Sequence, residues 1–211
     1  MQKQLVLWGC LILLACCRPV ASQQVVTGDV LLTDEFNQAY HWDAFAQQQV
    51  EVGVQNGAYA MRSNVKEYVL GRGLDQYTDV VIEVSSRQFS TFNKNAYGII
   101  CRASSGNSGS GYYFLIGGDG SYSIRKGRDQ KVDALVSWAH SGVIHWGQSR
   151  NLIRVVCVDD YLALYANGEF VTEVRDSTYQ SGYVGFVVAV AEGGVIDVTF
   201  DNLIIREAAL K

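Results

Sequence analysis

Hydrophobic and polar residues alternate along most of this chain with a period of two, as they do in half-buried β-strands. The alternating runs are short and rich in Val, Ile, Tyr and Phe, which favour strands. They lie at 50–54, 58–62, 79–85, 97–102, 112–116, 121–125, 151–158, 161–166, 169–174, 185–191 and 195–205. No segment carries the 3.6-residue period of a long helix. The pattern predicts an all-β protein of about twelve strands at roughly ten-residue spacing.

Asn-Gly and Asp-Gly pairs separate several of these runs and predict tight hairpin turns, because such turns need positive φ angles. The pairs are Asn56-Gly57, Asp119-Gly120 and Asn167-Gly168. Together with a Ser/Gly tract at 104–111, the second pair makes 97–127 a three-stranded antiparallel meander with a mobile edge loop. The following segment, 128–150, is the least regular part of the chain.

The first 22 residues read as a targeting segment. Lys3 precedes an apolar run at 5–15 that is too short for a permanent transmembrane helix. Two cleavage routes stay open: Leu13 to Cys16 resembles a bacterial lipobox with Cys16 as the lipidated residue, and Val20-Ala21-Ser22 fits ordinary signal peptidase cleavage. Either route places one domain, 23–211, outside the cytoplasm of a bacterium, as a secreted protein or a lipoprotein touching the membrane only through its N-terminal lipid.

The composition favours an all-β domain, and the net charge argues against nucleic-acid binding. The chain has 21 Gly and 12 Tyr but a single Pro, which suits an all-β domain. Without Lys3 and Arg18, its 17 basic and 21 acidic residues become 15 and 21, a net charge of about −6. Nucleic-acid binding requires a clustered cationic face, and the sequence shows none. We therefore expect no nucleic-acid partner.

Two cysteines remain in the domain after the leader is removed. Cys101 and Cys157 both lie in strand-like runs and would occupy an oxidising compartment. A disulfide between them would close a loop worth on the order of 4 kcal/mol in the chain-entropy model. The alternative is a pair of buried free thiols, and we favour the disulfide.

Several motifs, taken together in their order along the chain, resemble the concanavalin A-like lectin/glucanase jelly roll, a sandwich of two antiparallel sheets. They are Tyr97 to Arg102, Tyr112 to Ile116 with GDGSY, Asn151 to Cys157, Leu164 to Gly168 and Phe200 to Asn202. Over 30–207 the chain most resembles the extracytoplasmic group named for 3-keto-disaccharide hydrolases. That superfamily includes lectins, glycosidases and adhesion modules, so the resemblance implies a fold and leaves the activity open.

Catalytic motifs are not evident. Retaining glucanases of this superfamily carry E-x-D-x-x-E on a concave strand, and this chain lacks that pattern. Glu83, the nearest candidate, has no second carboxylate at i+2 or i+4 and reads as a solvated strand residue. No nucleophile elbow is present, and His140 and His145 read as loop residues rather than metal ligands. We predict no catalytic residue and no metal site.

A shallow groove on the concave sheet is the predicted ligand site, because aromatic faces and a few polar groups suit sugar rings. Alternation leaves Ser121, Ser123 and Arg125 on the open face. The predicted ligand-binding residues are Arg102, Tyr113, Arg125, Trp138 and His140. The alternative interpretation is that the aromatic residues pack in the core or at an edge and the arginines are solvated.

No cofactor is predicted. Structural calcium is an alternative at Asp34, Asp43 and Asp201, since the first and last strands of this fold are neighbours. Calcium prefers six to eight oxygen ligands, and we favour the interpretation that Asp201 binds backbone amides at a strand end.

The expected function is recognition of a glycan or cell-surface polymer without catalysis. Two alternatives remain: a glycoside hydrolase acting on 3-keto-disaccharides, and a structural or adhesive module with a protein partner.

Overall fold

The computed structural model describes residues 20–106, 108–191 and 193–211, so Cys16 and most of the predicted leader lie outside the described residues. The described residues form fifteen strands and no helix. The strands are β1 (Val25–Asp34), β2 (Phe45–Gln47), β3 (Val50–Gln55), β4 (Ala58–Ser63), β5 (Val69–Tyr77), β6 (Val80–Gln88), β7 (Asn95–Ala103), β8 (Gly111–Ile116), β9 (Ser121–Arg128), β10 (Lys131–His140), β11 (Arg150–Val158), β12 (Tyr161–Ala166), β13 (Glu169–Arg175), β14 (Gly182–Val190) and β15 (Ile196–Leu210).

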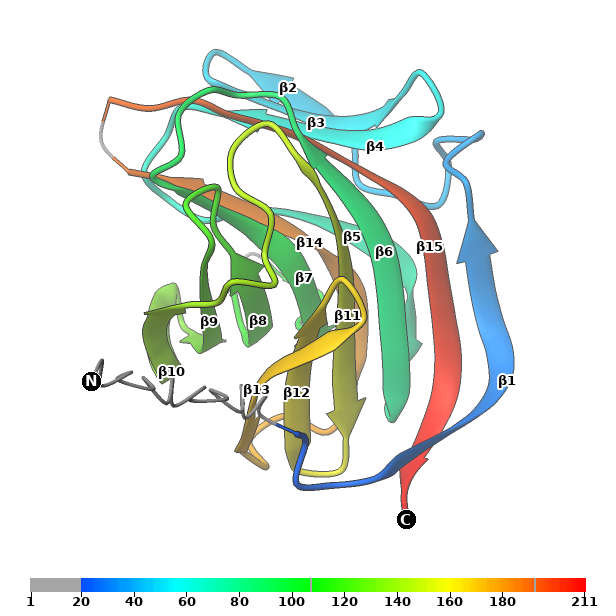
Figure 1. The fold of residues 1–211 in the computed structure, drawn as a ribbon. Coiled ribbons are helices and arrows are strands. Elements are labelled where there is room, and N and C mark those ends of the chain that lie inside the picture. The colour runs from blue at the N-terminus through cyan, green and yellow to red at the C-terminus, as the bar shows by residue number, and fades with distance from the viewer. Residues whose placement is uncertain (1–19, 107, 192) are drawn as a thin grey trace, which may run out of the picture.

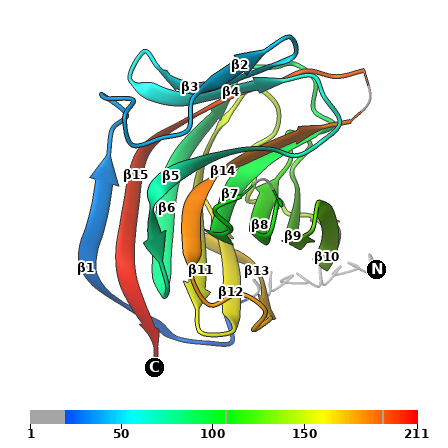
Figure 2. The same cartoon turned by 180° about the vertical axis from the view of Figure 1, so that it is seen from behind.

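Two antiparallel sheets stack to form a jelly-roll-like sandwich, which confirms the predicted all-β class (Figure 1). The nine-stranded sheet runs β13-β12-β11-β6-β15-β4-β3-β2, with β1 also pairing to β15. The six-stranded sheet runs β10-β9-β8-β7-β14-β5, an order that can be followed from right to left in Figure 2. None of the described segments is a helix that could cross a lipid bilayer.

The predicted meander at 97–127 is confirmed as β7, β8 and β9, which are consecutive neighbours in the six-stranded sheet. The β8–β9 turn closes through a hydrogen bond that the Gly117 amide donates to the Ser121 carbonyl, 2.8 Å. At the predicted β3–β4 turn, both Asn56 and Gly57 have positive φ angles, 52° and 73°. Such angles define the tight turns whose twist matches the flanking strands.

A core rich in aromatic residues fills the space between the sheets. The rings of Phe186 on β14 and Phe200 on β15 stack with centroids 4.3 Å apart, so they join the two layers directly. Trp42 packs against Phe186 at 5.2 Å and against Tyr59 at 5.3 Å. This geometry adds to the burial of large apolar surfaces, which dominates the stability of such sandwiches.

The face of the six-stranded sheet that points away from the core is also partly apolar. We call it the outer face. Its central strands bury a second cluster that includes Ile100, Tyr113, Leu115 and Val187. Strand alternation explains this arrangement, because Cys101 and Phe114, each next in sequence to a cluster member, belong to the core between the sheets. Partly buried side chains such as Tyr68 and Val132 pack over this cluster, so a ligand on the outer face would contact these covering residues.

The predicted disulfide is confirmed between Cys101 on β7 and Cys157 on β11, with Cα atoms 6.9 Å apart. The two cysteines are 56 residues apart in sequence and belong to different sheets. The bond therefore links the two layers at one end of the sandwich.

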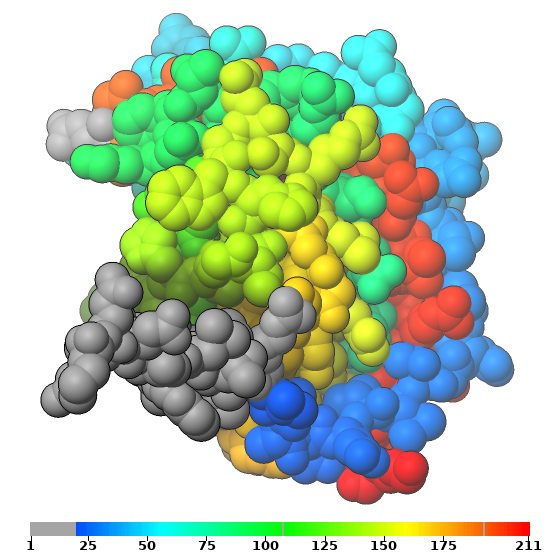
Figure 3. All heavy atoms as spheres, in the orientation of Figure 1, coloured from blue at the N-terminus to red at the C-terminus, as the bar shows by residue number. Residues whose placement is uncertain are grey.

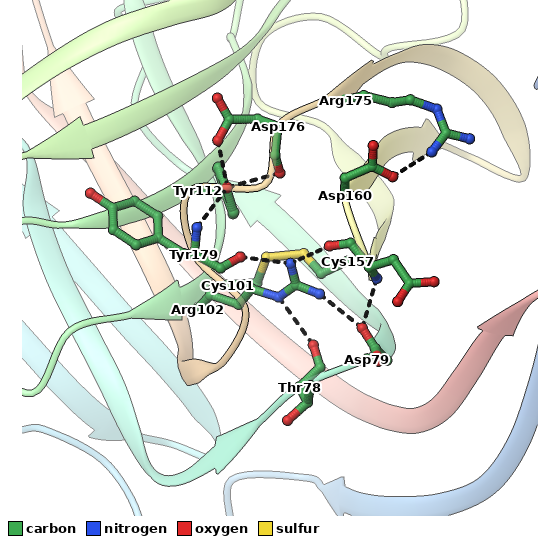
Figure 4. Close-up of polar contacts among 11 residues, drawn as sticks. Thr78, Asp79, Cys101, Arg102, Tyr112, Cys157, Asp160, Arg175, Asp176 and Tyr179 are labelled. Carbon is green, nitrogen blue, oxygen red and sulfur yellow. Dashed lines mark hydrogen bonds and ion pairs between the residues drawn. A yellow bond between two sulfur atoms is a disulfide. The ribbon is translucent and has the colours of Figure 1, made fainter.

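Arg102, one of the predicted ligand-binding residues, lies beside this disulfide and not on the outer face. Its guanidinium donates hydrogen bonds to the carbonyls of Thr78, Asp159 and Tyr179 and pairs with Asp79 at 2.9 Å (Figure 4). The residue is 3% exposed. Its φ angle is 53°, and β7 carries one extra residue against β14 at this point, where the register shifts. This β-bulge ends the alternation and turns Arg102 away from the face of Ile100.

Asp176, in the loop after β13, is the centre of a neighbouring polar cluster. It accepts hydrogen bonds from the Tyr112 hydroxyl at 2.6 Å and from Lys126 Nζ at 2.5 Å. The backbone amide of Thr178 donates another at 2.9 Å. Burial of Asp176 acts to raise the pKa of its carboxyl, but these hydrogen bonds outweigh it and hold that pKa well below its usual range. Burial and the bond to Asp176 raise the pKa of Tyr112 to about 12.

We expect this cluster to make the free energy of unfolding fall in acid. Because the unfolded carboxyl of Asp176 binds a proton more readily than the folded one, its contribution is present above about pH 4 and is lost as the pH decreases further. Replacing Asp176 by Asn should lower the free energy of unfolding at pH 7 by about 1.5 kcal/mol and flatten its decline between pH 4 and pH 2. Urea unfolding of both proteins across this range measures the difference. Parallel pH profiles for the two proteins would contradict the assignment.

Candidate functional site

Two hollows lie on the outer face, and Tyr68 lines both. The loop-side hollow has a volume of about 630 Å³, and the β10-side hollow has a volume of about 380 Å³. The loop-side hollow is lined by Asp43, Phe45, Gln47, Val50, Glu67, Tyr68, Val69, Leu70, Arg72, Gly106, Gly109, Tyr113, Gln130 and Val132. The β10-side hollow is lined by Lys66, Tyr68, Lys94, Asn95, Ala96, Asp119, Ser121, Trp138, His140, Ala189, Val190 and Ala191. We call the two hollows together the groove.

Arg72 on β5 builds one wall of the loop-side hollow. Its Nε pairs with Asp43 at 3.2 Å, and its Nη1 donates hydrogen bonds to the carbonyls of Ser104 and Gly106 at 2.8 and 3.1 Å. The Tyr113 hydroxyl donates to the Gly109 carbonyl at 2.6 Å. These bonds hold the Ser/Gly loop against the sheet from two sides.

Tyr68, which lines both hollows, forms an aromatic pair with Tyr113, and Arg125 lies next to that pair. The rings of Tyr68 and Tyr113 meet edge to face with centroids 5.4 Å apart. Arg125 on β9 is the cross-strand neighbour of Tyr113. Burial raises the pKa of Tyr68, and the positive charge of Arg125 acts in the opposite direction. Tyr113 is thus a neighbour of both Tyr68 and Arg125.

Trp138 and His140 line the β10-side hollow, both from the edge strand β10. Trp138 is 44% exposed, which leaves part of its indole available to a ligand. His140 Nε2 lies 3.9 Å from a carboxylate oxygen of Asp119 in the β8–β9 turn. Asn95 fixes that turn by accepting a hydrogen bond from the Gly118 amide at 3.0 Å. An exposed aromatic face beside polar side chains is a common arrangement for binding polar ligands with apolar faces.

The structure thus brings four of the five predicted ligand residues to one face and leaves Arg102 elsewhere. Tyr113, Arg125, Trp138 and His140 come from three consecutive strands, β8, β9 and β10. Tyr68 and Arg72 are not evident from the sequence as ligand residues, because the run around them carries Gly71 and Gly73 and shows no apolar alternation. Asp119 could have been found from its place in the predicted hairpin turn.

Carboxylates are scarce where a glycosidase would need them. The four central strands of the six-stranded sheet, β9, β8, β7 and β14, contain no Asp or Glu. Glu83 lies on the other sheet, in a separate hollow of about 200 Å³ that it shares with Arg154 and Arg206. Either common glycosidase mechanism requires two carboxyl groups about 5 to 10 Å apart, which flank the glycosidic bond. The centre of the groove does not supply them.

The residues considered for calcium are bonded to neighbouring groups. Asp34 accepts hydrogen bonds from the Phe36 amide and the Trp42 indole at 2.7 and 2.8 Å. Asp201 accepts one from the Asn202 amide at 2.7 Å. Within the described part of the chain, no three His, Cys, Asp or Glu side chains gather closely enough to hold a metal ion.

The loop between β10 and β11 closes the end of the sandwich beside the groove. The segment 141–149 lies next to the end of β6: the Gln88 amide donates to the Ser149 carbonyl at 3.1 Å, and the Gln148 side chain donates to the Phe89 carbonyl. In Figure 3 its yellow-green atoms lie beside the green atoms that follow β6. Trp146 on this loop is 64% exposed and lines neither hollow.

No protein-family model and no curated protein sequence matches this chain. Solved structures with the same fold are similar at low sequence identity. A carbohydrate-binding module, CBM66, from Bacillus subtilis has a TM-score of 0.59 at 11% identity, covering 70% of this chain and 86% of that one. A Bacillus subtilis protein of unknown function with a galectin-like fold has 0.64 at 11%, covering 88% and 99%. A Bacillus licheniformis β-glucanase has 0.61 at 9%, covering 85% and 98%.

Proposed function

We propose that this protein is an extracytoplasmic module that recognises a glycan or a cell-surface polymer without catalysing its hydrolysis. The ligand lies along the outer face, across both hollows, with Tyr68 beneath its middle. The observation that carries this proposal is the composition of the groove. It has aromatic side chains at Tyr68, Tyr113 and Trp138 and small polar side chains at Asn95 and Ser121, whereas the four central strands of the sheet have no carboxylate.

Sugars bind where an apolar ring face meets an aromatic side chain while polar groups reach the hydroxyls. Trp138 and Tyr68 supply aromatic surface, and Asn95, Ser121 and Gln130 supply hydrogen-bonding groups. A carbohydrate-binding module and a β-glucanase share the fold, so carbohydrate recognition is compatible with it. Because the two hollows can each hold a sugar unit, the groove suits an oligomer or polymer better than a monosaccharide.

An extracytoplasmic location agrees with the disulfide and with the predicted leader. A disulfide between Cys101 and Cys157 persists in an oxidising compartment. Cleavage after Ser22 would give a secreted protein, and lipidation at Cys16 would give one anchored to a membrane.

A hydrolase acting on 3-keto-glycosides is the main alternative. The β-glucanase with the same fold shows that the sandwich can support hydrolysis. Acidic residues do occur at the rim of the groove, at Asp43, Glu67 and Asp119. Asp43 is paired with Arg72 and Asp119 lies near His140, so both are already engaged with basic groups.

A glycan array probed with the 23–211 domain, followed by a hydrolysis assay on each bound glycan and on oxidised disaccharides, tests the proposal. We expect binding to oligosaccharides or polysaccharides with no release of sugar. Turnover of any bound glycan would favour the hydrolase. Failure to bind any glycan, with capture of a protein partner instead, would favour the adhesive module.

A further inference from the structure

Arg125 carries a positive charge beside Tyr113 and Val132, two residues that line the loop-side hollow. Its guanidinium has two long hydrogen bonds, from Nη1 to the Ser123 hydroxyl at 3.5 Å and from Nη2 to the Val132 carbonyl at 3.3 Å. Its Nε is buried and has no hydrogen-bond partner among the described residues. A guanidinium offers five N–H donors, so most of its donors are unused.

Two other arginines of the six-stranded sheet, one on β5 and one on β7, have ionic partners. Arg72 pairs with Asp43, and Arg102 pairs with Asp79. Arg125 forms no ion pair with a described residue, and its cross-strand neighbours are Tyr113 on β8 and Ala134 on β10. Both are uncharged. A charge that is partly buried and unpaired costs free energy, which an anion at the same place would recover.

The position of Arg125 indicates where that anion would lie. Its contacts to Val132 and its pairing with Tyr113 place it at the edge of the loop-side hollow. Tyr68, whose ring contacts Tyr113, lines both hollows. An oxyanion bound to Arg125 would therefore belong to the middle of a ligand whose two ends occupy the two hollows.

Resting on the proposed function, we propose that the ligand is an acidic glycan whose carboxylate or sulfate group binds Arg125. Arginine presents planar, parallel donors that match such oxyanions, which a lysine ammonium does not reproduce. The protein carries an overall negative charge, so a polyanion would not be attracted by the molecule as a whole. Recognition of an acidic glycan must then depend on a local cation, and Arg125 supplies it.

Affinity electrophoresis in gels containing polygalacturonate or its highly methyl-esterified form tests this inference, because the two polymers differ in charge and share a backbone. Agarose and a sulfated galactan form the second pair and separate carboxylate from sulfate recognition. We expect retardation by at least one acidic polymer and about tenfold weaker retardation by its neutral counterpart, as for loss of a charged hydrogen bond.

Arg125→Gln should weaken binding of the acidic polymer about tenfold, and Arg125→Lys should restore only part of it. Arg128→Gln, which removes the same charge from the exposed end of β9, is the matched control and should bind as the unchanged protein does. Thermal unfolding of each variant shows whether the fold is retained. Equal binding of neutral and acidic polymers, unaffected by Arg125→Gln, would overturn this inference and leave the proposed function standing. Binding to none of the polymers would overturn the inference, and if the glycan array is also negative the proposed function fails with it.

Discussion

Replacing Arg102 by methionine is expected to lower the free energy of unfolding by about 3–5 kcal/mol, because three backbone carbonyls lose a hydrogen-bond donor at a cost of about 1–3 kcal/mol each. The guanidinium is the shared donor for three backbone carbonyls and for Asp79, and it lies beside the disulfide that links the two sheets. Methionine can fill part of the volume but leaves these acceptors without their donor. Chemical denaturation of both proteins at neutral pH measures the difference.

Arg128→Met is the matched control, because Arg128 is exposed at the end of β9 and should change stability by less than about 0.5 kcal/mol. If Arg102→Met is as stable as this control, the hydrogen bonds and the ion pair of Arg102 do not hold the sheets together. Glycan binding gives a second, independent measurement. Arg102→Met that still folds at low temperature should bind glycan normally, since Arg102 lies outside the groove.

Replacing Trp138 by alanine is expected to weaken glycan binding about 30-fold or more, which corresponds to a hot-spot loss of about 2 kcal/mol. Trp138 presents a partly exposed indole to the β10-side hollow, where it can stack on the apolar face of a sugar ring. Its place on an edge strand means that little core packing is lost with it. Isothermal titration calorimetry with a glycan identified on the array measures the effect.

Trp146→Ala provides the control, because Trp146 is an even more exposed indole that lines neither hollow. We expect its affinity to stay within about twofold of the unchanged protein, as for a residue outside the binding surface. Equal losses of glycan affinity in the two variants would mean that binding depends on exposed tryptophans in general and not on the groove. A loss confined to Trp146→Ala would place the binding surface on the β10–β11 loop.

The sequence predicts the sandwich well where local signals agree with the tertiary structure. Asn56-Gly57 and Asn167-Gly168 adopt the positive φ angles that their hairpins require. Alternation at 121–125 correctly places Ile124 in the core and Arg125 on the opposite face. These features depend on backbone sterics and on a period of two, which are properties of short segments.

Strand β5 is not evident from the sequence, because two of its core-facing positions are glycines. A Cβ atom at Gly71 would lie 2.0 Å from the Tyr59 hydroxyl oxygen, and one at Gly73 would lie 3.5 Å from the Trp42 ring. Large side chains from elsewhere in the chain fill the core at these positions, so β5 has no apolar alternation of its own. Tyr68 and Arg72 were missed as groove residues for this reason.

Strand β10 and the position of Arg102 are also not evident from the sequence. The register of β10 against β9 shifts twice, between Ala134 and Val136 and between Val136 and Ala139, which disrupts its pattern. The bulge at Arg102 reverses the face on which alternation would place this residue. Bulges depend on pairing with a neighbouring strand, and that pairing is not encoded within the strand itself.

The most direct test of a ligand groove on the outer face is mapping of amide chemical-shift changes by NMR during titration with a bound oligosaccharide. We predict that the largest changes fall on Tyr68, Tyr113 and Trp138, which line the two hollows, and on the neighbouring Arg125. Changes gathered instead around Val81 and Val156, on the far side of the nine-stranded sheet, would contradict a site on this face.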